Sequence, residues 1–370
     1  MHAARHAPRH GRRSAGMNAM QNENLLSAAS ARLDAMLRRC TRHRIDQLLF
    51  NDGARPATHC YALVSTGQCD EGVIASMVAA YGLSFERLFM QTPEAEMADI
   101  GPWLIEIPLS GSEALRRSLA RHAASQALTL MCSPMRLPRL CEHLRGFLSG
   151  TLADGSPVLL RYFDPRVGFD MLAHWPASVQ GQFMQPLDWW AGWDGDAQLR
   201  HANGDADIET APRRDAIELA PEWARAMDKM GEAHLLVALL AEELEASNPT
   251  DAMLLEQIHP LLCRQIAQAA LAFIHRAGFA GWSNKAQACH QALLRHARFH
   301  AHPGFLEILP RASEPLELRE VLARVPRAVQ QEWAQDRDAM LVRLCDAQAD
   351  VLLASLDQPA SFSACRSATL

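Results

Sequence analysis

The charged side chains best placed to do chemistry in this sequence lie in the run RYFDPR, at residues 161–166. The run closes an apolar stretch of strand length, and α/β folds place ligands at the carboxyl ends of strands. Arg161, Asp164 and Arg166 could therefore form a polar site. A second interpretation needs no ligand, because Asp164 could cap a helix that begins at Pro165 while pairing with an arginine. We favour this capped turn, since single Arg–Asp pairs are common in structural networks.

A group of histidines near one predicted helix end is the best candidate for a metal site: His290, His296, His300 and His302. A spacing of four puts His296 and His300 on one face of a helix. Zinc also needs further ligands and hydrogen-bonded support for them, and no acid follows until Glu307. Histidines suit the negative end of a helix dipole, so we predict a solvated helix end without metal.

The usual catalytic signatures do not occur in the sequence. It contains no G-x-S-x-G elbow, no G-x-G-x-x-G after a strand, no H-E-x-x-H and no calcium loop. A P-loop needs Gly-Lys-Ser/Thr, but Lys229 precedes methionine and Lys285 precedes alanine. We therefore expect no enzyme and no cofactor. The alternative is a hydrolase-like or nucleotide-handling α/β enzyme that uses Arg161, Asp164 and Arg166.

Bulk composition narrows the classes of partner and compartment. The 370 residues carry a formal charge of −6, which gives no electrostatic case for nucleic acid. The longest apolar stretches, such as residues 235–241, fall far short of the roughly 20 residues that span a bilayer. The nine cysteines are scattered without a C-x-x-C pair, which favours buried thiols in a reducing cytoplasm. The arginine-rich start lacks the apolar run of a secretory signal, so we expect a cytoplasmic protein.

Short apolar runs alternate with helical patterns in the first half of the chain. We predict helices over residues 72–81, 112–125 and 136–148. The runs have the length and composition of strands and occupy residues 60–64, 103–107, 127–131 and 158–163. Such alternation predicts an α/β layer with a mostly parallel sheet and flanking helices.

The second half has a different pattern. Residues 187–201 predict a hairpin around Asp194-Gly195-Asp196, and no convincing strand follows. Helical patterns cover residues 221–247, 249–277, 284–299 and 317–356. We therefore predict a disordered basic leader (1–24), an α/β domain (25–201), a linker (202–220), an α-helical domain (221–356) and a flexible tail (357–370).

Five short blocks, in this order, resemble a family of adaptor chaperones encoded beside type VI secretion effectors. They are Tyr61-Ala62-Leu63, Leu88-Phe89 before Thr92-Pro93-Glu94, residues 101–106 (GPWLIE), residues 140–148 before Asp154-Gly155, and residues 158–166 (VLLRYFDPR). The last block is the most specific, and the resemblance covers about residues 48–193. One departure is the sequence Val64-Ser65-Thr66-Gly67, where similar proteins have an acidic residue and glycine. Any role for a carboxylate there is therefore in doubt.

The resemblance implies a binding role without chemistry. Its partners would be a cognate toxin effector and the spike (VgrG-type) protein, with no membrane insertion and no nucleic acid. The residues that carry the family signature or a protein contact would be Tyr61, Pro102, Trp103, Arg161, Phe163, Asp164, Pro165 and Arg166.

Overall fold

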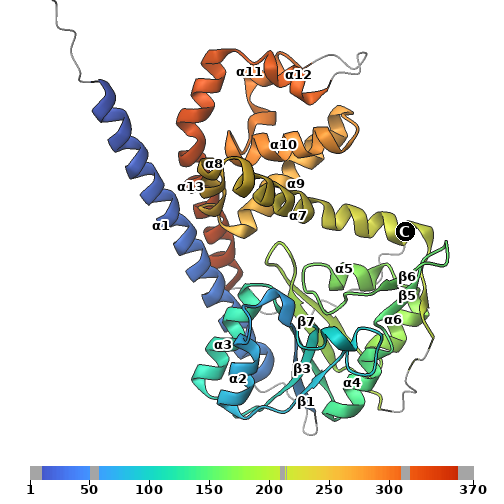
Figure 1. Cartoon of the computed structure of the whole chain (residues 1–370). Coiled ribbons are helices and arrows are strands. Elements are labelled where there is room, and N and C mark those ends of the chain that lie inside the picture. Colours follow the sequence, from blue (N-terminus) through green and yellow to red (C-terminus); the bar gives the residue numbers. More distant parts are fainter. Residues whose placement is uncertain (1–10, 51–57, 209–212, 214, 310–316, 357–370) are drawn as a thin grey trace, which may run out of the picture. The chain divides into compact units, whose positions relative to one another are not determined.

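The structure is a computed structural model that describes residues 11–50, 58–208, 213, 215–309 and 317–356, with side chains from Leu25 onward (Figure 1). The chain divides into two compact units. The helical unit contains residues 1–36 and 233–351, and the sheet unit contains residues 37–232 and 352–370. The divisions fall within three helices, α1 (Gly11–Ile45), α7 (Pro221–Ser247) and α13 (Arg327–Leu356). Part of the predicted leader, residues 11–24, has helical backbone in α1, while residues 1–10 and the predicted tail lie outside the described residues.

The sheet unit is built on a six-stranded sheet in the order β2-β3-β1-β4-β7-β8. Every pair of neighbours is antiparallel, so the prediction of a mostly parallel sheet is wrong. The strands are β1 (His59–Ser65), β2 (Phe85–Arg87), β3 (Pro102–Ile107), β4 (Leu128–Ser133), β7 (Trp189–Trp193) and β8 (Leu199–Asn203). The predicted hairpin is confirmed, because β7 and β8 pair through the turn after Trp193.

The error has a topological cause. Helix α2 (Val73–Tyr81) connects β1 to β2, and helix α3 (Glu113–Ala124) connects β3 to β4. Each helix joins strands that run in the same direction, as the alternating pattern suggested, but another strand lies between them. Strand β3 separates β1 from β2, and β1 separates β3 from β4. This is the split βαβ arrangement of ferredoxin-like folds, extended here by the β7–β8 hairpin.

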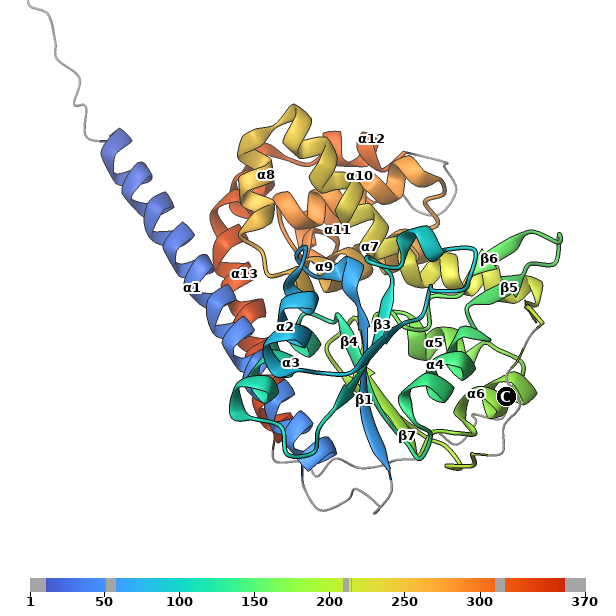
Figure 2. The ribbon, with the colours of Figure 1, turned by 60° about the horizontal axis from the view of Figure 1, so that its bottom comes forward.

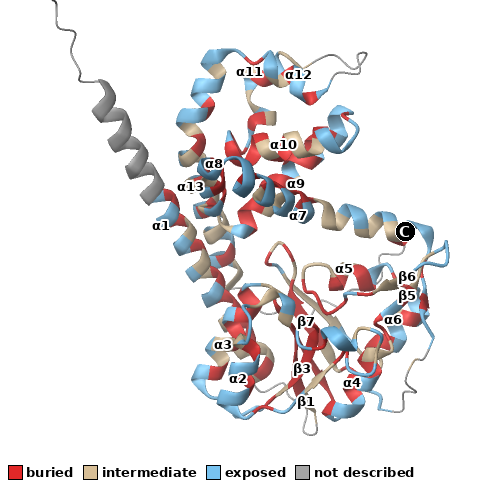
Figure 3. Cartoon of the chain, viewed as in Figure 1, coloured by how far each residue is buried: buried red, intermediate tan, exposed pale blue. Residues whose placement is uncertain are grey.

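Helices cover both faces of this sheet (Figure 2). Ala62 and Val64 of β1 pack toward α2 and α3, whereas Tyr61 and Leu63 pack on the opposite face. That face is covered by α4 (Leu137–Arg145), α5 (Gly168–Ala173) and α6 (Ala177–Met184). Burial on both faces, visible in Figure 3, makes a strand an unbroken apolar run instead of an alternating one.

A second, small sheet contains β5 (Ser149–Thr151), β6 (Pro157–Leu159) and β9 (Ile217–Glu218). Strand β5 pairs antiparallel with β6 and parallel with β9. The strand predicted over residues 158–163 therefore ends at Leu159, and the chain turns from Leu160 onward. Strand β9 lies within the segment predicted as a linker.

The helical unit confirms the prediction of α-helices in the second half of the chain. Besides parts of α1, α7 and α13 it contains α8 (Pro249–Glu256), α9 (Pro260–Ala277), α10 (Trp282–Leu294), α11 (Pro303–Leu306) and α12 (Leu318–Ala323). Asn248 caps α8 by accepting the Asp251 N–H, and Pro260 begins a new helix where one long helix was predicted. Among the described helices, none is long and apolar enough to cross a membrane.

A disulfide joins Cys60 and Cys132, although the sequence predicted only thiols. The two residues are 72 positions apart in the sequence, but they face each other across β1 and β4. Their pairing depends on which strands are neighbours in the sheet, and this order cannot be inferred from the spacing of the cysteines. Cys40, Cys141 and Cys263 are buried thiols, as predicted.

Candidate partner-binding surface

The run at residues 161–166, here called the signature loop, is organised by the carboxylate of Asp164. The Asp164 side chain is 3% exposed. Its Oδ2 accepts hydrogen bonds from Arg161 Nη2 at 2.9 Å and Arg166 Nη2 at 2.8 Å. Its Oδ1 accepts from Arg166 Nε at 2.9 Å and from the Arg166 backbone N–H at 3.1 Å. The signature loop thus contains the Arg–Asp pair that the sequence predicted, and the pair with Arg166 is bidentate.

Two opposing effects set the charge of Asp164. Burial would raise the pKa of the carboxyl, but the hydrogen bonds and positive charge of Arg166, with the charge of Arg161, lower it overall. The group is therefore a carboxylate at neutral pH. A general base needs a pKa near the working pH and a free lone pair directed at its substrate. Both carboxylate oxygens of Asp164 instead accept hydrogen bonds from the two arginines, which hold the loop together.

The predicted helix start is displaced. Helix α5 begins at Gly168, not at Pro165, and the Asp164 carbonyl accepts the Gly168 N–H at 2.7 Å. Gly168 lies so close to the Tyr162 backbone that a Cβ there would overlap the Tyr162 carbonyl oxygen, well inside any real contact distance. The chain must complete this tight return before it can become helical. Gly168 was not singled out from the sequence, where a glycine two residues after the block was the available signal.

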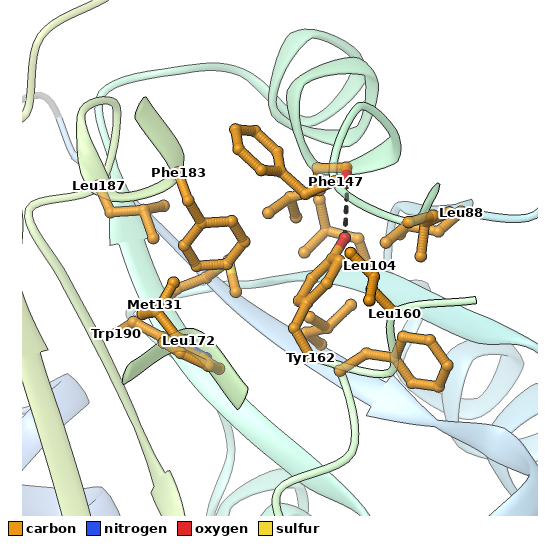
Figure 4. Close-up of a cluster of buried hydrophobic side chains, with 14 of the residues drawn as sticks. Leu88, Leu104, Met131, Phe147, Leu160, Tyr162, Leu172, Phe183, Leu187 and Trp190 are labelled. Carbon is orange, nitrogen blue, oxygen red and sulfur yellow. Dashed lines mark hydrogen bonds between the residues drawn. The ribbon is translucent and has the colours of Figure 1, made fainter. Parts of the chain in front are cut away.

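Aromatic side chains fix the signature loop on two sides, and Figure 4 shows the side of Tyr162. Tyr162 is fully buried, and its hydroxyl donates to the Leu144 carbonyl at 2.7 Å, at the end of α4. Phe163 meets Phe89 edge to face, with ring centroids 5.9 Å apart. The loop is therefore attached to α4 through Tyr162 and to the segment after β2 through Phe163.

Removing the Asp164 carboxylate should destabilise the protein. We expect Asp164→Ala to cost roughly 2–4 kcal/mol, because it leaves a largely buried guanidinium and a backbone N–H without their acceptor. Asp164→Asn should cost less, since its amide oxygen can still accept the Arg166 N–H. The free energy of unfolding in urea measures both. Equal losses for the two variants would contradict this account.

The other signature residues lie in the core rather than on the surface. The Tyr61 hydroxyl donates to the Met135 carbonyl at 2.7 Å. Pro102 is buried, and its carbonyl accepts the Leu88 N–H. Trp103 packs on the opposite face of the sheet, where its Nε1 donates to the Ala98 carbonyl at 3.1 Å. Phe163 and Pro165 are also buried, so Arg161, with its side chain 52% exposed, is the signature residue most open to a partner.

Residues 89–100 form a compact run of turns between β2 and β3, here called the turn segment. Successive backbone hydrogen bonds span three residues each, including Thr92 N–H to Phe89 O and Met97 N–H to Glu94 O. Thr66 Oγ1 donates to the Gly101 carbonyl at 2.6 Å and anchors the end of the segment. Three large apolar side chains of the segment remain exposed: Met90 (44%), Met97 (46%) and Ile100 (66%). Sequence reasoning did not single them out.

A cleft of about 540 Å³ adjoins the turn segment. Residues 91–94 border it together with residues from α4, the chain between α4 and β5, the start of β5 and the chain before β9: Pro138, Glu142, Arg145, Gly146, Leu148, Ser149, Arg213 and Asp215. Leu148 accepts the Leu160 N–H, so the cleft adjoins the start of the signature loop as well. Arg145 donates to the carbonyls of Arg87 and Leu88 at 2.9 and 3.1 Å, at the end of the edge strand β2.

Of the four histidines of the possible metal site, His296 and His302 lie edge to face, with ring centroids 6.1 Å apart. Each pairs with its own carboxylate, His296 with Asp336 at 3.5 Å and His302 with Glu332 at 3.4 Å. The His300 ring instead stacks on Phe273, with centroids 5.6 Å apart. Burial lowers the pKa of His296 despite the opposing effect of Asp336. Within the part of the chain that the structure describes, no three His, Cys, Asp or Glu side chains could together hold a metal ion.

Comparison with known proteins places one family on this part of the chain. A family model described as a domain of unknown function (DUF4123) matches residues 60–182. The matched stretch runs from β1 into α6 and contains the turn segment, the signature loop and most of the cleft. No curated protein and no solved structure matches the chain.

Proposed function

We propose that this protein is an adaptor that binds a cognate type VI secretion effector in the producing cell and helps to load it onto the spike protein. The match over residues 60–182 carries the proposal, because that family is associated with effector adaptors of type VI secretion. The ordered blocks of the sequence lie within or beside the matched stretch and resemble the same kind of protein.

The geometry of the sheet unit supports a binding role without catalysis. The most specific sequence block builds a saturated ion-pair network and an aromatic anchor. Next to that network, the turn segment presents apolar side chains to solvent. Exposed apolar side chains that a fixed frame holds in one place are typical of protein-binding surfaces. We propose that this surface carries the contact common to the family.

The proposal is tested by co-expression and by gene deletion. Co-expression with the effector encoded beside this gene should yield a complex that survives purification. Deletion should abolish delivery of that effector alone, and a plasmid copy should restore it. Loss of every effector to the same extent would instead identify a core component of the secretion machine. The absence of any complex with the neighbouring gene products would overturn the proposal.

A further inference from the structure

We infer that the turn segment and the adjoining cleft bind a cationic, amphipathic segment of the partner protein. The apolar side chains of that segment would pack against the exposed methionines, and its lysines or arginines would pair with the carboxylates of this surface. The inference rests on the proposed function, since it assumes that a partner protein exists. It adds the chemistry of the partner segment and its place on this chain.

The apolar half of the surface comes from one short stretch. Met90, Met97 and Ile100 are each more than two-fifths exposed within eleven residues of chain. Methionine is unbranched, flexible and polarisable, so it adapts to differently shaped apolar side chains. Surfaces that must accept variable partners use such residues. An apolar anchor from the partner would therefore gain burial here without demanding one fixed shape.

The charged half of the surface is negative. Glu94 and Glu142 line the cleft, and Glu96 is exposed within the turn segment. Among the described residues, none of these three carboxylates has an ion-pair partner.

The two cleft arginines are occupied within the protein. Arg145 donates to the Arg87 and Leu88 carbonyls, and Arg213 donates to Gln182 Oε1 at 2.9 Å and to the Asp215 carbonyl. Both guanidiniums keep their positive charge, and Arg145 also pairs with Glu86 at 3.7 Å. With Asp215, which lines the cleft too, the carboxylates of this surface outnumber its two arginines. Positive side chains are attracted to such a surface, whereas phosphate-bearing ligands are repelled.

The frame of this surface is already in place. Trp103 Nε1 holds the Ala98 carbonyl, and Thr66 holds those of Asp99 and Gly101. Gly101 lies against the Phe89 ring, which in turn meets Phe163 of the signature loop. Because the segment needs little ordering when the partner arrives, less of the binding energy is spent on it. The signature loop therefore acts as a support for the surface rather than as the surface itself.

Photo-crosslinking in the complex of the full chain with the neighbouring effector tests the location. A photoreactive amino acid replaces either Met97 or Met253, which is the matched control because it is an exposed methionine in the helical unit. We expect Met97 to crosslink to an effector peptide rich in arginine or lysine and apolar residues, and Met253 to crosslink less. A complex that crosslinks only through Met253 overturns the inference and leaves the adaptor function standing. Failure of the wild-type chain to form any complex overturns both.

Charge reversal tests the chemistry. We expect the triple variant Glu94→Lys, Glu96→Lys and Glu142→Lys to weaken effector binding by about tenfold or more at low salt. The matched control reverses three exposed carboxylates of α7, Glu242→Lys, Glu243→Lys and Glu245→Lys, with the same change in net charge. Both variants are checked for wild-type thermal unfolding. Equal binding by the two folded triple variants would show that the turn segment does not select a cationic partner.

Discussion

Alanine at position 168 should destabilise the protein by about 3 kcal/mol or more, the upper end of what overpacking costs. The added Cβ would overlap the backbone carbonyl of Tyr162 rather than a side chain that could rotate away. To relieve this overlap, the turn after Asp164 would have to open. Opening would strain the hydrogen bonds of the Asp164 carboxylate and the packing of Phe163. The free energy of unfolding in urea, with circular dichroism as the signal, measures the loss.

Gly181→Ala is the matched control for this substitution. Gly181 lies inside α6, and a Cβ there meets no atom within 4 Å. Alanine should therefore stabilise the helix by about 0.5–1 kcal/mol. If the two substitutions change stability by similar amounts, the close approach at Gly168 is not what the signature loop depends on.

Stability should also fall steeply as the pH drops from about 6.5 toward 4. Burial lowers the pKa of both His143 and His122 to about 4. The unfolded chain binds a proton near the ordinary histidine pKa of about 6.5, before the folded chain does. The stability that each neutral histidine contributes is therefore complete above that pH and is lost progressively down to about pH 4. At pH 5 the loss should be about 2 kcal/mol for each histidine.

Glutamine variants separate these two residues from other acid-sensitive groups. His143 Nε2 contacts the Phe183 carbonyl at 3.1 Å, and a glutamine amide can donate there without titrating. The quantity to compare is the change in unfolding free energy between pH 7 and pH 5 within each variant. His143→Gln should lose about 2 kcal/mol less over this range than the wild type, and the double variant with His122→Gln about 4 kcal/mol less. A wild-type slope in the double variant would mean that both histidines titrate in the folded protein as they do in the unfolded chain.

Local sequence patterns predicted the elements well but not their neighbours. The apolar runs at residues 60–64, 103–107 and 127–131 are strands β1, β3 and β4, and α7 matches its predicted bounds. Strand order is a long-range property, because β3 pairs with β1 across the connection that contains α2 and β2. The sheet direction and the Cys60–Cys132 pair were therefore out of reach. The break at Pro260 was available in the sequence, where an X-Pro step disfavours a continuous helix.

The candidate site was predictable only where residues are adjacent in sequence. Asp164 and its two arginines lie within six positions, so their pairing could be inferred, but the later start of α5 depends on the contact between Gly168 and Tyr162. The exposure of Met90, Met97 and Ile100 could not be read from sequence. Apolar side chains in a turn-rich stretch are as compatible with burial as with exposure until the surrounding frame is known.

The two hydrogen bonds from Arg145 to the Arg87 and Leu88 carbonyls bear on how this edge of the sheet would meet another chain. An edge strand with open carbonyls is a template for a strand of another chain and so a route to aggregation. The Arg145 guanidinium already occupies the carbonyl of Arg87 at the end of β2 and that of Leu88 just after it. It also places a positive charge beside the edge along which another backbone would pair. This margin of the sheet is thereby less able to pair with a strand from a second copy of the chain.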